Sequence, residues 1–343
     1  MSTVDTKQQA YTNRLNAISN QVSSLMQLLN GMNRNVTNID GSLNRLPTRI
    51  QQIRKMNYCV MINLEKDVAS LSEEWSTIKP NVSSIITSAV SALASEGRIF
   101  EGELAQRRFN PNSDVSQLTN LGMRVSTLQA RVSDLSSRVS GTTGATLSKL
   151  NSLEKDVGVA ERTLNLIFNP SFKWKEGESP ILSIQAKDLI NDVKGILSLT
   201  SQRFLYESEK EVVLKKTLFI ATQKKKVRET AVDKPIGMID SIVKGRVGIL
   251  AGQGLYITFK PNNGQQEMKF DTSGEDADLV LHFQNFISNG GADQELDVTE
   301  SSKKDESQHA PIVCSKCGAP YTEEIYRGQT SLICKYCSTS IPV

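Results

Sequence analysis

The stretch Gly195-Ile-Leu-Ser-Leu-Thr-Ser-Gln-Arg-Phe-Leu-Tyr206 decides the fold of the middle of this chain. Thr200-Ser201 is a plausible turn with a short apolar run on each side of it. Alternate residues of a strand share one face of the sheet, and four side chains fall at that two-residue spacing. They are Leu197, Leu199, Phe204 and Tyr206. The stretch therefore predicts two antiparallel strands whose Leu and aromatic side chains line a core.

Further β-type runs, separated by turn signals, lie on both sides of this hairpin. The runs are 181–187, 195–199, 203–206, 212–222, 237–243, 247–250, 255–260 and 267–271. Seven or eight short strands predict an antiparallel sandwich or a half-open barrel. The run from Glu275 to Ile287 starts acidic and places apolar residues at helical spacing, so we expect one helix after the strands.

This order of elements resembles the pleckstrin-homology-like (PH-like) superfamily, in particular its GRAM and bacterial PH branches. The resemblance rests also on Glu176-Gly-Glu178 before the first strand and on the Leu-Thr-x-x-Arg pattern at 199–203, followed by Phe204 where the family usually has Leu or Ile. It covers about residues 179 to 290. It implies a β-barrel capped by a carboxy-terminal helix, in a module that binds proteins or phosphoinositides.

The same region carries a basic cluster. Its members are Lys215, Lys216, Lys224, Lys225, Lys226 and Arg228. Near an anionic leaflet each charge contributes about 1 kcal/mol, so the cluster is a candidate contact for anion or lipid. Lysine runs are also common on exposed strand edges, where they deter edge pairing, and a solvated loop is the alternative interpretation.

The first part of the chain carries an apolar seam with steps of four and three residues. Its members are Tyr11, Leu15, Ile18, Val22, Leu25, Leu29, Met32, Val36, Ile39, Leu43, Leu46, Ile50 and Ile53, followed by Asn57, Val60 and Leu64. Such a repeat is typical of a left-handed coiled coil, here with Asn57 at a core-type position. One helix alone would leave the seam exposed, so the helix must pair with a second copy or with a later segment. We predict a homo-oligomer.

Later segments repeat the pattern with interruptions. After Leu64 the phase slips by one residue, as in a stutter, and Pro47 and Pro80 mark predicted kinks or breaks. Two further stripes run over 115–139 and 150–167, on either side of Gly141–Gly144, and residues 108–114 read as a turn. We expect 81–107 and 114–140 to form an antiparallel hairpin. Spectrin-like bundles, dynamin-like bundles and a dimeric rod share this pattern.

Composition supports a modular chain. The 343 residues carry 40 Lys and Arg against 37 Asp and Glu, a net charge of +3, with 6% aromatic residues. This length allows two or three units, and the charge excludes a strongly basic nucleic-acid-coating protein. Residues 1–64 hold seven Lys or Arg against two Asp, so a basic arm touching lipid or nucleic acid is the alternative to a purely structural stalk.

Four of the five cysteines form two C-x-x-C pairs. Cys314 and Cys317 are separated by 16 residues from Cys334 and Cys337. Two such turns joined by a hairpin can close a tetrahedral four-thiolate shell, and the segment resembles the zinc ribbon family. Four cysteines leave no open position, so we predict a structural and not a catalytic zinc. Strands at 321–326 and 330–333 should form the hairpin, and we favour protein docking over nucleic-acid contact.

We find no constellation of a nucleophile, a base and an orienting group, so we predict no enzyme. His282 reads as a helix-surface residue, His309 as linker and Cys59 as a seam-flanking residue. Gly248, Gly252 and Gly254 have the wrong spacing for a dinucleotide loop. The first residues lack a secretory signal and no run is apolar enough to span a membrane, so we expect a cytoplasmic protein, with peripheral attachment to a membrane surface as the alternative.

The predicted architecture is a multidomain α + β protein. Its parts are a helical coiled-coil stalk at 1–168, a PH-like β domain at 169–290, a flexible linker at 291–311 and a zinc ribbon at 312–343. The predicted function is a non-enzymatic scaffold or adaptor that self-associates and binds proteins or anionic membranes. The alternatives are a nucleic-acid-associated factor that uses the ribbon and the basic stalk, and a membrane-remodelling coiled-coil protein.

Overall fold

The computed structural model forms two compact units. The bundle unit is Met1–Thr48 with Leu64–Lys155, and the sheet unit is Arg49–Asn63 with Asp156–Val343. The structure describes residues 3–109, 115–217, 220–247, 252–261, 267–292, 295, 313–320 and 325–342. Within these ranges, the side chains at 3–6, 109, 115–117, 211–217 and 220–226 are not described.

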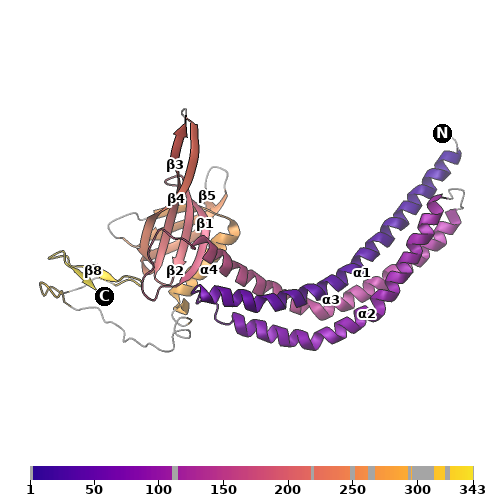
Figure 1. Cartoon of the computed structure of the whole chain (residues 1–343), viewed down its shortest axis with the longest axis horizontal. Coiled ribbons are helices and arrows are strands. Elements are labelled where there is room, and N and C mark those ends of the chain that lie inside the picture. Colours follow the sequence, from indigo (N-terminus) through magenta and orange to yellow (C-terminus); the bar gives the residue numbers. More distant parts are fainter. Residues whose placement is uncertain are drawn as a thin grey trace. The chain divides into compact units, whose positions relative to one another are not determined.

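Three long helices run side by side in the bundle unit (Figure 1). They are α1 (Thr3–Lys55), α2 (Leu64–Phe109) and α3 (Val115–Leu166). Glu103 pairs with Arg124 at 3.0 Å and Glu96 with Arg131 at 2.6 Å, so α2 and α3 run antiparallel. The predicted hairpin is confirmed. Part of its turn, 110–114, lies outside the described residues.

The apolar seam of α1 is buried inside this single chain. Ile18, Val22 and Leu29 are at most 1% exposed and belong to one core with residues of α2 and α3, such as Val82 and Val125. The sequence allowed either a second copy of the chain or a later segment to cover the seam. In the structure, later segments of the same chain cover it. A second copy of the chain would therefore have to use another surface.

The helix breaks considered at Pro47 and Pro80 are wrong, because both residues lie inside continuous helices. Helix α1 continues through Pro47, α2 through Pro80, and α3 through Gly141–Gly144. A proline inside a helix costs about 3 kcal/mol or more, and the long buried face of each helix offsets that cost. The break lies instead at 56–63, between α1 and α2. Asn57 is exposed there at φ 63°, outside any helical seam.

Seven antiparallel strands form one sheet in the sheet unit. They are β1 (Pro180–Asp188), β2 (Val193–Thr200), β3 (Arg203–Thr217), β4 (Ile220–Pro235), β5 (Ile239–Val247), β6 (Gly252–Phe259) and β7 (Glu267–Asp271). Their order is β4-β3-β2-β1-β7-β6-β5. Within the described residues the edge strands β4 and β5 do not pair, so the sheet is open and the β-barrel that the resemblance implies is not seen.

The sheet builds its core from the side chains that the sequence selected. Leu197, Leu199, Phe204 and Tyr206 are at most 1% exposed. The Phe204 ring packs edge-on to that of Phe259, at 5.4 Å between centroids. The helix α4 (Gly274–Ser288) begins where Ser273 caps it, and buries Ala277, Val280, Phe283 and Ile287.

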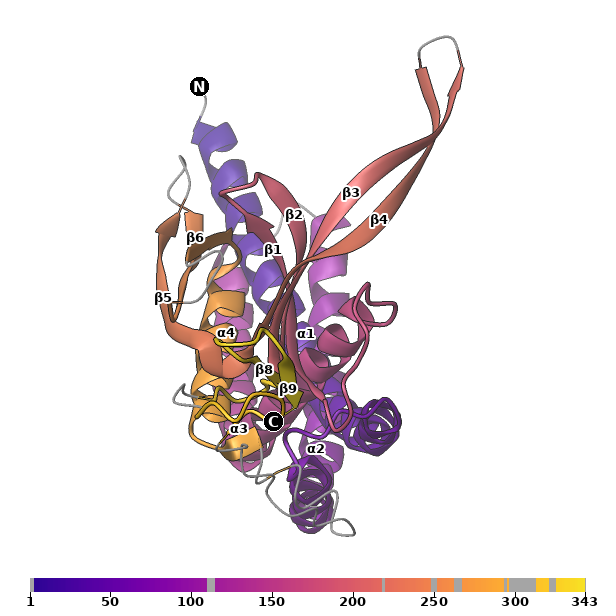
Figure 2. The same ribbon diagram turned by 90° about the vertical axis from the view of Figure 1, so that its left-hand side faces the viewer.

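The β3–β4 hairpin extends past the rest of the sheet (Figure 2). Strand β2 pairs with β3 only as far as Ser208, whereas β3 and β4 remain paired out to Thr217 and Ile220. The single strand predicted at 212–222 is therefore wrong, because it spans the outer ends of two strands. We call residues 209–228 the arm.

The link between α1 and α2 is fixed within the sheet unit. Arg54 donates hydrogen bonds of 2.7 to 2.8 Å to three backbone carbonyls of the link. The buried Tyr58 hydroxyl donates to the carbonyl of Ile181 at 3.2 Å, and the Met61 N–H donates to Glu295 at 2.7 Å. Residues 291, 292 and 295 are helical, and the rest of the predicted linker, 293–294 and 296–311, lies outside the described residues.

Candidate metal centre

The four ribbon cysteines lie on two turns of the same geometry. In the first, the Gly318 N–H donates to the Cys314 carbonyl at 2.8 Å. In the second, the Ser338 N–H donates to the Cys334 carbonyl at 2.8 Å. Gly318 has φ 69° and Ser338 has φ 55°, so both turns require the left-handed conformation that glycine adopts most easily. The serine at 338 does not change the turn.

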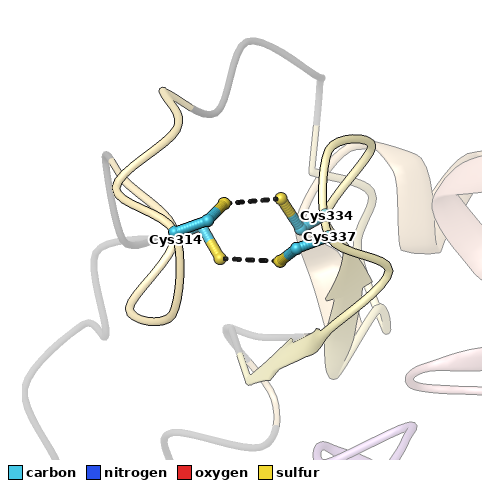
Figure 3. Close-up of side chains that lie close together, drawn as sticks. Cys314, Cys334 and Cys337 are labelled. Atoms are coloured by element: carbon cyan, nitrogen blue, oxygen red, sulfur yellow. Dashed lines mark hydrogen bonds between the residues drawn. The ribbon is translucent and has the colours of Figure 1, made fainter.

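The four sulfurs converge on one point (Figure 3). The Sγ atoms of Cys314 and Cys337 are 3.7 Å apart, and those of Cys317 and Cys334 are 3.6 Å apart. All four lie within 4.8 Å of one another. Sulfurs at about 2.3 Å from a tetrahedral zinc would be roughly 3.8 Å apart, so the donor set fits this ion. The cluster could hold a metal ion, consistent with zinc, and four thiolates would complete its shell.

Local hydrogen bonds favour the thiolate at two of these cysteines. The N–H groups of Cys317 and Lys316 lower the pKa of the Cys314 thiol. The Thr339 hydroxyl, 3.2 Å from the Cys337 sulfur, lowers the pKa of that thiol to about 6. At Cys317 the Ala319 N–H lowers the pKa, but the Cys337 thiol, burial and the other thiols outweigh it and raise the pKa to about 12. Metal binding needs thiolates, so the contacts at Cys314 and Cys337 favour the ligand form, whereas Cys317 would lose its proton only to a bound ion.

The ribbon has little apolar core of its own. Strand β8 (Ser331–Ile333) pairs with β9 (Ser340–Pro342). Leu332 of β8 and Ile341 of β9 pack with Cys314 and Cys334. The predicted strand at 330–333 exists, but its observed partner is β9. Of the other predicted strand, 321–324 lies outside the described residues. So small a core makes a bound metal the main source of folding energy for the ribbon.

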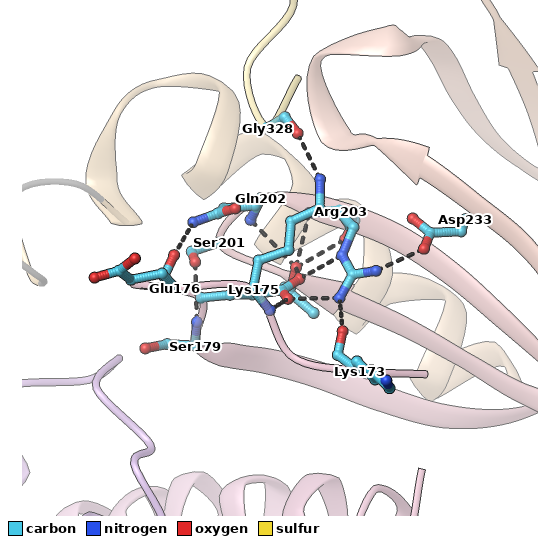
Figure 4. Close-up of polar contacts among 11 residues, drawn as sticks. Lys173, Lys175, Glu176, Ser179, Ser201, Gln202, Arg203, Asp233 and Gly328 are labelled. Carbon is cyan, nitrogen blue, oxygen red and sulfur yellow. Dashed lines mark hydrogen bonds and ion pairs between the residues drawn. The ribbon is translucent and has the colours of Figure 1, made fainter. Parts of the chain in front are cut away.

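The Leu-Thr-x-x-Arg pattern of the β2–β3 turn, at 199–203, contributes to a buried charge cluster (Figure 4).

 Arg203 binds both carboxylate oxygens of Glu178, at 2.9 and 2.6 Å, and these two side chains are 4% and 0% exposed. The Thr200 hydroxyl donates to Glu178 at 2.6 Å and accepts from the Arg203 N–H at 2.7 Å. A third guanidinium contact reaches Asp233 at 2.6 Å. The pattern quoted from the sequence therefore fixes the turn to the segment that precedes β1.

The ion pair sets the protonation of the buried acid. Burial alone would raise the pKa of Glu178, but the hydrogen bonds from Arg203, Thr200 and the Lys175 N–H outweigh it and lower that pKa below its usual value. The carboxylate stays charged, as its partner requires. Sequence reasoning found Thr200 and Arg203 as a pattern and missed their pairing with Glu178.

A loop of the ribbon contacts the sheet directly. Arg327 donates to the backbone carbonyls of Ser201 and Ile287, each at 3.0 Å, and its own carbonyl accepts from the Gly237 N–H at 3.2 Å. The Lys175 ammonium donates to the Gly328 carbonyl at 3.0 Å. We call these four contacts the dock. Sequence reasoning missed it.

A cleft of about 660 Å³ lies beside the Glu178 segment. Its lining includes three apolar side chains that are 40 to 70% exposed, Met56, Phe168 and Trp174. Cys59 also lines the cleft, and it belongs to the link between α1 and α2, so its assignment to the helical seam is wrong. The volume is in the range of small-molecule sites.

The predicted anion contacts divide into two groups. Arg228 pairs with Glu209 at 3.2 Å and donates to the Leu166 carbonyl at 2.6 Å. The other members, Lys215, Lys216, Lys224, Lys225 and Lys226, lie on strands β3 and β4, and their side chains are outside the described residues. His282 is exposed on α4, as predicted, and His309 lies outside the described residues.

Comparison with known proteins leaves the family open. No family model matches the sequence, and no curated protein matches it. The structure has a weak similarity to the Vps36 N-terminal PH domain, with a TM-score of 0.22 and 13% identity over 39% of this chain and 92% of that one. A second is the complex of PDZ-RhoGEF DH/PH domains with GTP-gamma-S activated RhoA, with a TM-score of 0.25 and 10% identity over 84% and 95%.

A third similarity is to autoinhibited Vav1, with a TM-score of 0.21 and 10% identity over 95% of this chain and 70% of that one. Scores of this size carry no argument about family or function. Among the described helices, none combines the length and the apolar character that crossing a membrane requires.

Proposed function

We propose that this chain is a non-enzymatic, cytoplasmic adaptor whose PH-like sheet unit binds anionic membrane surfaces through the arm. The single observation that carries this proposal is the register of the β3–β4 hairpin. Val213 lies opposite Lys224, Lys215 opposite Gln223, and Lys216 opposite Ala221. Two lysine runs that are separate in sequence are thereby brought to the same outer end of the arm.

The charge of the arm changes along its length. Near the sheet its cations have acidic partners: Arg228 pairs with Glu209, and Lys210 pairs with Glu229 at 2.7 Å. Glu211 lies opposite Lys226, and beyond it residues 212–225 contain no Asp or Glu. Between the lysine runs the sequence is Leu218-Phe219-Ile220, and such residues favour a membrane interface. Basic and apolar residues together suit an anionic lipid surface.

The ribbon supplies the second half of the adaptor. We propose that its four cysteines hold a structural zinc, which leaves the ribbon surface for docking to a protein. Ile333 and Tyr336 are 67% and 75% exposed there, and exposed apolar side chains are common at protein interfaces. Homo-oligomerisation through the helices is not part of this proposal, because the seam that suggested it is covered within one chain.

Co-sedimentation of the full chain with liposomes tests the arm. We expect binding to vesicles that contain phosphatidylserine and none to pure phosphatidylcholine vesicles. Replacing Lys224, Lys225 and Lys226 by Gln should weaken binding by up to about 100-fold, at roughly 1 kcal/mol per charge.

The matched control removes the same charge elsewhere, by Gln substitutions at the exposed Lys7, Lys66 and Lys194. It should change binding little. Equal losses in both triple variants would show a general charge effect and contradict a site on the arm. Binding to DNA at low salt with no binding to liposomes would favour a nucleic-acid partner instead.

A further inference from the structure

The dock joins the ribbon to one side of the cleft that lies beside the Glu178 segment. Lys175 lines the cleft and donates to the Gly328 carbonyl of the ribbon at 3.0 Å. The same side of the cleft, the Trp174–Glu178 wall, is held a second time by Gln202, whose side-chain amide donates to the Glu176 carbonyl at 3.0 Å. Gln202 lies directly under the ribbon loop, because a Cβ added to Gly328 would be 1.7 Å from the Gln202 carbonyl oxygen.

Arg327 is the anchor of the dock. Its guanidinium donates to the Ile287 carbonyl near the carboxyl end of α4, and the dipole of a helix favours a cation at that end. It also donates to Ser201 in the β2–β3 turn, so one side chain joins the ribbon to two elements of the sheet unit. Lys260 lies over the Tyr326 ring at 4.6 Å and adds a cation–π contact next to it.

Among residues 313–320 and 325–342, the described part of the ribbon, the small core around the cysteines does not include the loop residues Arg327 and Gly328. Leu332 and Ile341 are the apolar residues packed with the buried cysteines, and closing the two cysteine turns around an ion is what orders so small a unit. The position of Arg327 therefore depends on the state of the four cysteines.

We propose that the metal-bound ribbon is an intrachain latch, which holds the Trp174–Glu178 wall in place and so makes the shape of the cleft depend on metal occupancy. This goes beyond the proposed function, because it uses neither the arm nor any lipid. Release of the metal would free the loop, and the wall would lose its contacts with Gly328 and its support through Gln202.

Hydrogen exchange of the full zinc-loaded chain tests the latch at the Gly237 amide, which donates to Arg327 across the dock. We expect Arg327→Ala and Gly328→Ala each to speed its exchange about tenfold or more, and chelation of the metal to do the same. Both variants should still bind Co(II) with a four-thiolate spectrum. The control Lys316→Ala removes a charge from the exposed first cysteine turn and should change nothing.

The fluorescence emission of Trp174, which lines the cleft, reports on the shape of the cleft. In a Trp75→Phe background Trp174 is the remaining tryptophan, since the chain has two. We expect its emission to shift in the same direction on chelation and in Arg327→Ala. Unchanged Gly237 exchange in Arg327→Ala would overturn the dock, and an unchanged Trp174 emission with a released dock would overturn the link to the cleft. Release by Arg327→Ala but not by chelation would overturn the dependence on metal.

Discussion

Glu178 binds the guanidinium of Arg203 with both of its carboxylate oxygens, and both side chains are removed from solvent. The pair joins the segment before β1 to the first residue of β3. A buried pair is weak evidence for net stability, but removal of one partner leaves a buried charge without compensation. The Phe172 ring, 5.3 Å from the guanidinium carbon, encloses the pair further.

Arg203→Leu should therefore destabilise the sheet unit by about 3 to 5 kcal/mol. Urea unfolding followed by Trp174 emission in the Trp75→Phe background measures this loss. The control Lys210→Gln breaks a pair whose side chains are 58% and 66% exposed. It should cost less than about 1 kcal/mol. Similar losses in the two variants would contradict the importance of burial.

The same pair predicts an acid limb in the stability of the sheet unit. The pKa of Glu178 is lowered in the folded chain, so its contribution is present above its unfolded pKa and is lost as the pH falls through the folded pKa. Urea midpoints measured from about pH 7 down to 3 should fall at the acid end. Glu178→Gln should be less stable at neutral pH and show a flatter limb. The exposed Glu176→Gln should keep the wild-type slope.

The left-handed Ser338 predicts a stabilising substitution in the second cysteine turn. A residue with a Cβ costs about 1 to 2 kcal/mol in this conformation, so Ser338→Gly should tighten zinc binding, measured by competition with a chelator. Gly318→Ala should weaken it by a similar amount. Ser315→Gly, in the first turn but without a positive φ, should not tighten binding. If it did, backbone conformation would not be the cause.

The bundle unit should be sensitive at its seam and tolerant outside it. Leu128 is 1% exposed on α3, and Leu128→Ala should cost about 2 to 5 kcal/mol, measured by the loss of helical circular dichroism on heating or in urea. Met123 lies on the same helix and is 61% exposed. Met123→Ala should remain within about 0.5 kcal/mol of the wild type. An equal effect of the two would contradict burial of the seam.

Periodicity predicted the helices and strands because it reports which side chains must be buried. The apolar steps found the face of α1, and two-residue spacing found Leu197, Leu199, Phe204 and Tyr206. Periodicity could not select the partner of a helix, since a second copy and a later segment bury the same face equally well. The effect of Pro47 and Pro80 on helix continuity was overestimated, because the local free-energy cost of one proline is small compared with the gain from burying a helix face of many residues.

The candidate metal centre was predictable because its side-chain chemistry is visible in the sequence. Cysteine spacing alone selected the four cysteines whose sulfurs converge in the structure and could hold a metal ion. The dock was not predictable, because Arg327 binds backbone carbonyls, which every residue offers. The Glu178 pair lies between these cases. Its residues were visible as a pattern, but a charge pair separated by 25 positions has no signature in one sequence.

The end of α1 and the link that follows it, together Arg49–Asn63, belong to the sheet unit although they are synthesised long before β1. Tyr58 binds Ile181, which is synthesised 123 residues later, and Met61 binds Glu295, which is synthesised 234 residues later. Neither unit is therefore continuous in the chain, and a truncation at any single peptide bond between 64 and 155 would leave both incomplete. The bundle unit is complete once Lys155 has been synthesised, whereas the sheet unit cannot finish folding until translation has passed the strands, so completion of the sheet unit is a late step in the folding of the protein.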